Sequence, residues 1–208
     1  MKNATKHAEE LKSLCRKLVK EHKPAEKADQ EPLWALVRGA MSFDVPDGRV
    51  EEAIKVIQRE FCDLNELRVA TELEVQEMLG SRYPKIEQRV KMITSALNAI
   101  FEKEHTLSLD RLKEVSRRDA RQFLRDLPDM HPYVEAYVML MSFNGHAFPV
   151  DETMLAFLHG EEILEEGTSL EEAIRFVEHH LKAEECYPAF TAMRAAVTEG
   201  RGKRKVKA

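Results

Sequence analysis

Cysteine, glycine and proline are scarce in this chain of 208 residues, which holds 3 cysteines, 8 glycines and 8 prolines. The cysteines are Cys15, Cys62 and Cys186, and their wide spacing and odd number exclude a simple disulfide framework and any C-x-x-C metal site. The few glycines and prolines leave long stretches without helix breakers, and Leu, Ala, Glu, Lys and Met are plentiful. The composition therefore predicts an all-α protein.

Long apolar segments are also missing. No run approaches the roughly 20 apolar residues that a membrane-spanning helix needs, and residues 1–14 have no apolar core of the kind found in signal peptides. We therefore expect a cytoplasmic protein. The eight histidines show no spacing typical of a metal site, and we expect no metal centre.

A surplus of positive charge is missing as well, since the net charge is −5. Five basic residues lie in 201–208, so the rest of the chain carries 27 basic and 37 acidic side chains, a net charge of −10. Residues 161–185 contain nine glutamates against Arg175 and Lys182. Proteins that bind duplex DNA usually present a basic face. The charge balance therefore argues against tight, nonspecific DNA binding, most of all at 161–185.

Apolar spacing and capping signals divide the chain into helices. Pro32 and Pro84 each suit the first residue of a helix, Gly80 suits a helix end, and Val45-Pro46-Asp47-Gly48 suits a turn. The predicted helices span 4–22, 32–43, 49–61, 72–79, 84–103, 116–126, 133–143, 152–160, 169–183 and 187–198. The helix at 133–143 is apolar on nearly every side, which predicts that it is buried.

The segment 127–151 carries the most specific pattern, LPDMHPYVEAYVMLMSFNGHAFPVD. It reads as a helix end, a short hairpin, a second helix, a glycine loop and an aspartate that opens a third helix. This order resembles the helix-hairpin-helix DNA glycosylases of the endonuclease III superfamily, whose hairpin reads L-P-G-V-G-x-[K/Y/S/W]-T-A and whose V-D follows one helix later. The matching positions are Leu127, Pro128, Tyr133, Val150 and Asp151. Asp129 and His131 replace the two hairpin glycines.

The resemblance covers roughly residues 32–196 and implies an all-α, two-lobed fold with the active site in the cleft between the lobes. The expected parts are a six-helix lobe over 26–143 with the helix-hairpin-helix at about 116–143, a second lobe of 1–25 with 144–200, and a basic flexible tail over 201–208. The implied function is base-excision repair by an N-glycosylase that acts on a damaged or mismatched base flipped out of duplex DNA. We expect such a protein to act as a monomer.

The resemblance implies that Asp151 is the catalytic carboxylate, which stabilises the developing sugar cation or activates water. The alternative is an N-cap of helix 152–160 without a catalytic role. Tyr133 stands where bifunctional members carry the lysine that forms a Schiff base with the sugar. We therefore expect a monofunctional enzyme that leaves the DNA strand intact and has Tyr133 in its pocket, the alternative being a tyrosine packed at a helix start.

In the hairpin, Asp129, Met130 and His131 would face DNA. The family's glycines let backbone N–H groups approach a phosphate, often with a monovalent cation. Asp129 opposes a phosphate, protonated His131 offsets that charge, and Pro132 removes one donor. The alternative is a loop kept only for structure. The four-cysteine iron–sulfur cluster of endonuclease III cannot form within one chain, because Cys186 is the only cysteine in the C-terminal half.

The remaining expected DNA contacts lie on three other segments. Met41 stands where endonuclease III has a glutamine that fills the gap left by the flipped base, and core packing is its alternative. Arg82 and Lys85 match the intercalating loop of the family. A stripe of Arg117, Arg121 and Arg125 could follow a phosphate backbone, and solvated charge is the alternative for both basic groups.

The replaced hairpin glycines favour a second interpretation of the whole chain. It would be a catalytically degenerate relative that serves as a DNA-binding or protein-interaction module.

Overall fold

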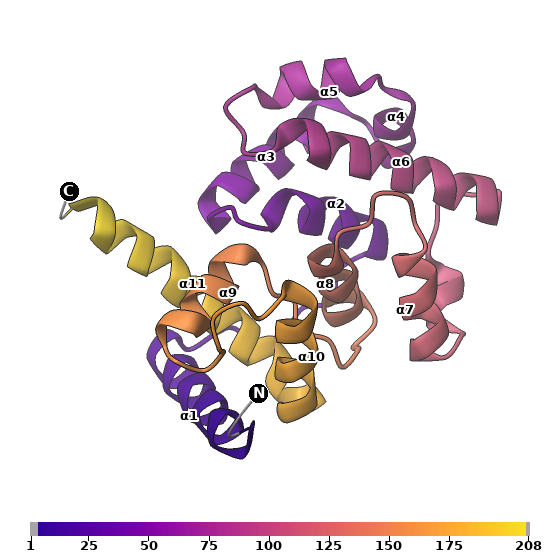
Figure 1. Ribbon diagram of the computed structural model, residues 1–208. Coiled ribbons are helices and arrows are strands. Elements are labelled where there is room, and N and C mark those ends of the chain that lie inside the picture. Colours follow the sequence, from indigo (N-terminus) through magenta and orange to yellow (C-terminus); the bar gives the residue numbers. More distant parts are fainter. Residues whose placement is uncertain (1–3, 207–208) are drawn as a thin grey trace.

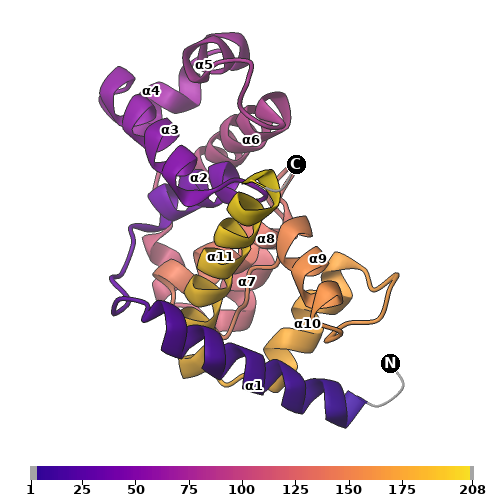
Figure 2. The ribbon, with the colours of Figure 1, turned by 90° about the vertical axis from the view of Figure 1, so that its left-hand side faces the viewer.

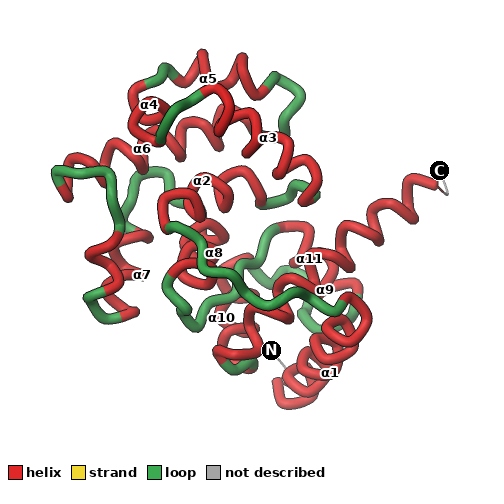
Figure 3. The backbone as a smooth tube through the Cα atoms, turned by 180° about the vertical axis from the view of Figure 1, so that it is seen from behind, coloured by secondary structure: helices red, strands yellow, loops and turns green. Residues whose placement is uncertain are grey.

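The structure, a computed structural model, describes the backbone of residues 4–206 and the side chains of 5–200. Within 4–206 the chain forms α-helices and one 3-10 helix and no β-strand, which confirms the predicted all-α class (Figures 1 and 3). The elements are α1 (Ala4–His22), α2 (Pro32–Ser42), α3 (Asp47–Glu60), α4 (Leu64–Val69), α5 (Glu72–Leu79), α6 (Ile86–Glu104), η1 (Asp110–Lys113), α7 (Arg117–Arg125), α8 (Pro132–Ser142), α9 (Glu152–Gly160), α10 (Leu170–His180) and α11 (Ala183–Val206).

Most predicted helices agree with the structure to within a few residues, and α1, α5 and α9 agree at both ends. The short elements α4 and η1 were not predicted, because four to six residues are too few to show an apolar period. The predicted turn at 45–48 is wrong in its second half, since α3 already begins at Asp47 with Pro46 as its N-cap. The backbone of α11 continues to Val206, where the sequence led us to expect a flexible tail, and the side chains of 201–208 lie outside the described residues.

The helices form two groups with α7 and α8 between them (Figures 1 and 2). In one group α2 packs against α3 and α6, and α4 and α5 pack on α6. In the other α1 lies across α11 and α10, and α9 packs on α11 and α10. The central helix α8 touches both groups through α2 and α11, and every residue from Tyr133 to Met141 is buried. The prediction that this helix is buried is therefore confirmed.

No helix over the described part of the chain is long and apolar enough to cross a membrane.

Candidate active site

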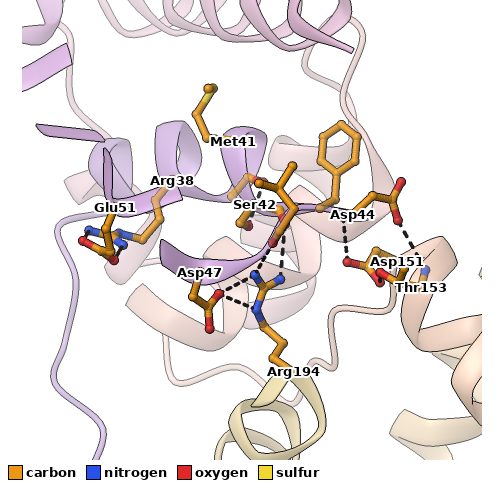
Figure 4. A network of polar contacts seen from close by, with 12 residues as sticks. Arg38, Met41, Ser42, Asp44, Asp47, Glu51, Asp151, Thr153 and Arg194 are labelled. Carbon is orange, nitrogen blue, oxygen red and sulfur yellow. Dashed lines mark hydrogen bonds and ion pairs between the residues drawn. The ribbon is translucent and has the colours of Figure 1, made fainter. Parts of the chain in front are cut away.

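Asp151 directly precedes α9 and has only 3% of its surface exposed. Its Oδ1 accepts hydrogen bonds from the N–H of Met154 and the hydroxyl of Thr153, both at 2.8 Å. Its Oδ2 accepts a third, also at 2.8 Å, from the backbone N–H of Asp44. The carboxylate is therefore an N-cap of α9, and it also joins α9 to the loop that follows α2 (Figure 4).

Asp44 completes the junction from the other side. Its Oδ1 accepts a hydrogen bond from the N–H of Thr153 at 3.3 Å, and its Oδ2 pairs with Lys85 Nζ at 3.0 Å. The backbone of Asp44 lies in the left-handed region with φ 57°, a conformation in which aspartate is enriched over most residues. Two carboxylates thus share the N-terminus of α9, where orphan N–H groups and the helix dipole stabilise negative charge.

Phe43, the neighbour of Asp44, connects the site to the hairpin through a contact with His131. The ring of His131 stacks on it with centroids 4.4 Å apart and planes 4° apart, and the guanidinium of Arg89 lies 3.8 Å from its centroid. Arg89 is fully buried and donates to the carbonyls of Ala40 and Phe43 at 2.6 Å and of Pro84 at 2.7 Å. Burial lowers the pKa of Arg89 to about 10, so it stays charged near neutral pH. Arg89 therefore provides donors for carbonyls at the C-terminal end of α2. It also holds Phe43 in place against the ring of His131.

Of the two positions that replace hairpin glycines, Asp129 keeps a glycine-like backbone and His131 is extended, with φ −79°. Asp129 has φ 56°, in the left-handed region, and its carboxylate lies 3.3 Å from Lys91 Nζ. His131 is the N-cap of α8, and its Nδ1 accepts a hydrogen bond of 3.2 Å from the N–H of Tyr133. Burial lowers the pKa of the His131 imidazole. The positive charge expected at His131 is thus opposed by its surroundings, and Lys91 compensates Asp129.

Tyr133 lies in the protein interior with 0% exposure. Its hydroxyl accepts hydrogen bonds from Arg194 Nη1 at 2.6 Å and from Ser42 Oγ at 3.2 Å, and burial raises its pKa. Arg194, from α11, also donates to the carbonyls of Ser42 at 3.3 Å and Val45 at 3.0 Å. Its Nε and Nη2 both donate to Asp47 (Figure 4). Arg194 thus joins α11 to the loop after α2.

A cavity of about 210 Å³ lies beside Arg194, where α2, α8 and α11 meet. The aromatic side chains of Tyr137, Tyr187 and Phe190 line it. The other lining residues are Gln30, Arg38, Ser42, Asp47, Val50, Glu51, Met141, Thr191 and Arg194. The volume is below the ~300–1,000 Å³ of sites for drug-sized ligands. Such a space suits one small ring system with polar groups at its edge.

The arginines of the predicted stripe on α7 bond mainly to other groups of the protein. Arg117 donates to the carbonyl of Phe143. Arg121 pairs with Glu178 through two hydrogen bonds of 2.9 Å, and its Nε lies 2.6 Å from Glu135. Arg117 and Arg125 are nevertheless exposed, and 58% of the Arg125 side chain is accessible. The sequence signal for this network was Glu135, a single carboxylate inside an otherwise apolar helix.

The other predicted contact residues differ in accessibility. Met41 is fully buried in the core, so in this structure its side chain has no surface with which to enter a duplex. Arg82 is exposed, and Lys85 is half exposed beside Asp44. The structure therefore brings Lys85, His131 and Asp151 together around the loop 43–44, while Met41 and Tyr133 point into the interior.

Three members of the site were absent from the sequence prediction: Asp44, Arg89 and Arg194. Each acts through main-chain groups of residues 43–45, in the loop after α2. In the sequence, Arg194 is the only charged residue in the run PAFTAMRAAV over 188–197, and this isolated charge was the signal that was overlooked.

Metal ligation has no evident place in the described residues, where no group of three or more His, Cys, Asp or Glu side chains could hold an ion. Cys15 and Cys186 are buried and Cys62 is exposed. Burial raises the pKa of the Cys15 and Cys186 thiols to about 12.

Comparisons by sequence find no matching protein-family model and no matching curated protein. Comparison with solved structures finds clear likenesses. An 8-oxoguanine glycosylase/lyase from Clostridium acetobutylicum, in complex with dsDNA containing cytosine opposite to 8-oxoG, has a TM-score of 0.73 at 18% identity, over 96% of this chain and 71% of that one. An endonuclease III–DNA covalent intermediate has 0.70 at 14% identity, over 90% and 84% of the two chains. The 3-methyladenine DNA glycosylase MagIII of H. pylori, bound to 1,N6-ethenoadenine, has 0.65 at 14% identity, over 95% and 98%.

The chain therefore has the helix-hairpin-helix DNA glycosylase fold, as the pattern over 127–151 predicted.

Proposed function

We propose that this protein is a monofunctional N-glycosylase that removes a damaged or mismatched base from duplex DNA. The observation that carries the proposal is the placement of Asp151. Its carboxylate stands at the N-terminus of α9, next to the hairpin, and is held by donors from both helix groups. A fixed negative charge at this position would oppose the positive charge that develops on the sugar as the base leaves.

The cavity beside Arg194 supports the same proposal. The glycosidic bond cannot be attacked inside the base stack, so a glycosylase needs a pocket for the flipped base. Aromatic side chains of Tyr137 and Phe190 would stack on a base there, and Asp47 and Thr191 offer polar groups at its edge. Ser42 and Arg194 line the cavity and also bind the hydroxyl of Tyr133. Tyr133 would then act behind the pocket, as a positioning residue for Arg194.

A second candidate function is a DNA-binding module without catalysis. Both oxygens of Asp151 already have donors, and the side chain is almost wholly buried. A sugar could meet the carboxylate only if the loop at Asp44 moved. A chain that has lost this motion would keep the fold and bind DNA without excising a base.

A panel of duplexes separates the two candidates. We would incubate the purified protein with duplexes that carry uracil, oxidised, alkylated or mismatched bases, and measure release of the base. The glycosylase is supported when one duplex loses its base with wild-type protein and keeps it with Asp151→Asn. Thr153→Ala is the matched control, because it removes one donor to Asp151 and leaves the carboxylate. Duplex binding without base release from any member of the panel would favour the noncatalytic module.

A further inference from the structure

A second cavity, of about 440 Å³, lies between the hairpin and α10. Its volume falls within the ~300–1,000 Å³ typical of small-molecule sites. The lining residues are Arg121, Arg125, Met130, Pro132, Glu135, Glu171, Ile174, Arg175 and Glu178. None of these residues lines the cavity beside Arg194, so the two cavities are distinct.

The negative charges of Glu135 and Glu178, which line this cavity, are balanced by arginines of the protein itself. Glu135 is 3% exposed and lies 2.6 Å from Arg121 and 3.3 Å from Arg125. Glu178 accepts both hydrogen bonds of Arg121 and a third, of 3.0 Å, from the N–H of Phe148. The charge of Arg121 is therefore used inside the protein, by Glu135 and Glu178, and the ion pair with Glu178 joins α7 to α10.

Two arginines at the rim, Arg125 and Arg175, have most of their N–H donors available to a ligand. Arg125 makes one contact of 3.3 Å to Glu135, and Arg175 makes one of 4.0 Å to Glu171. Their side chains are 58% and 70% exposed. A guanidinium has five N–H donors in a planar fork that matches the oxygens of a phosphate. The rim of the cavity is thus suited to an anionic group of that geometry.

The remaining lining is apolar. Met130, Pro132 and Ile174 contribute side chains without charge, and Ile174 is buried. A ligand that fits both parts carries a phosphate at one end and a flat, weakly polar group at the other, which is the chemistry of a nucleotide. A base can pack against apolar side chains, and arginine adds a cation–π contact that does not depend on which base it is.

We propose that this cavity holds one nucleotide of the DNA strand that passes the hairpin, with its phosphate between Arg125 and Arg175. Met130 belongs both to the cavity and to the hairpin, which favours a strand nucleotide over a free one. Residues 161–185 looked unsuited to DNA because glutamate dominates them, yet the fold commits Glu178 to Arg121 and turns Arg175 toward the hairpin cavity. The inference rests on the DNA-binding part of the proposed function and not on base excision.

The test measures affinity for an undamaged, fluorescently labelled duplex and for its single strand at several salt concentrations. We expect Arg125→Ala and Arg175→Ala each to weaken binding by about three- to tenfold and to lower the slope of log affinity against log salt by about 0.7–0.9. Arg59→Ala is the matched control, since Arg59 is 71% exposed on α3 and pairs only with its neighbour Glu60 among the described residues. It should leave both quantities unchanged.

A parallel titration with deoxyadenosine monophosphate identifies the source of the nucleotide. Weak binding of the monophosphate that both variants lose, together with the loss of DNA affinity, supports the proposal. Unchanged DNA affinity and salt slope in both variants, measured while wild-type protein binds DNA, overturns it, and so does monophosphate binding without any effect on DNA. Since no step requires base release, a protein that never excises a base can still pass or fail this test.

Discussion

The backbone N–H of Asp44 donates a hydrogen bond of 2.8 Å to Asp151 Oδ2. The N–H of Thr153 returns a bond of 3.3 Å to Asp44 Oδ1. The loop after α2 and the first turn of α9 are thereby joined at two points. Lys85 holds the other oxygen of Asp44, so the loop that precedes α6 shares the junction. Any motion that exposes Asp151 must break these bonds first.

Asp151→Asn should abolish base excision and also destabilise the fold. An asparagine caps α9 about as well as aspartate, but its NH₂ must face the N–H of Asp44 or the donors of α9, whichever way the amide is turned. One buried donor then lacks an acceptor, at a cost of about 1–3 kcal/mol. Urea unfolding measures this loss, and Thr153→Ala provides the comparison with the carboxylate intact. Full excision activity in Asp151→Asn would contradict the catalytic role.

Borohydride should trap no covalent adduct between this protein and its DNA substrate. Tyr133 has no amine and its hydroxyl is buried, so no imine with the sugar can form there. The product of the reaction should be an intact strand with an abasic site, seen by gel electrophoresis before and after alkaline treatment. An adduct would contradict this expectation, and its loss in Lys85→Ala would identify Lys85 as the responsible amine.

Arg194→Met should lower the free energy of unfolding by about 2–4 kcal/mol. Methionine fills similar space, but the carbonyl of Val45 loses its donor. The carbonyl of Ser42 and the hydroxyl of Tyr133 each lose one of two donors, and Asp47 loses its ion pair. Arg59→Met, at an exposed position on α3, should change stability by less than about 0.5 kcal/mol. Equal unfolding midpoints for the two variants would show that the Arg194 network adds nothing to stability.

The contribution of His131 to stability should depend on pH. Burial lowers its pKa below the ordinary 6.5, so the unfolded chain binds the proton more readily than the folded one. The contribution is therefore complete above about pH 6.5 and is lost as the pH falls through the lower pKa of the folded state. His131→Asn can still cap α8 but does not titrate. The difference in unfolding free energy between wild type and this variant should shrink from pH 7.5 to 5.5, and a constant difference would refute the argument.

Local patterns in the sequence were enough to place most helices, because apolar spacing and caps act within one helix. The spacing of Leu11, Leu14 and Leu18 predicted α1, and an aspartate before an apolar run predicted the cap of α9. The combination of L-P at 127–128 with V-D at 150–151 was specific enough to indicate the helix-hairpin-helix glycosylase fold, which the solved structures then confirmed.

Only the tertiary structure decided which side chains reach a surface and which partners they meet. Asp44 and Asp151 are 107 residues apart, Tyr133 and Arg194 are 61 apart, and Arg121 and Glu178 are 57 apart. Nothing in a helical period encodes such pairs, since each depends on how whole helices dock. The packing of the helices places Tyr133 in the interior behind Arg194 and brings Glu178 into an ion pair with Arg121. Arg125 stays exposed, because Glu135 is its only acidic partner among the described residues. The sequence thus determined the helices and the resemblance to the glycosylase fold. The packing of those helices determined which charged side chains remain available to a ligand.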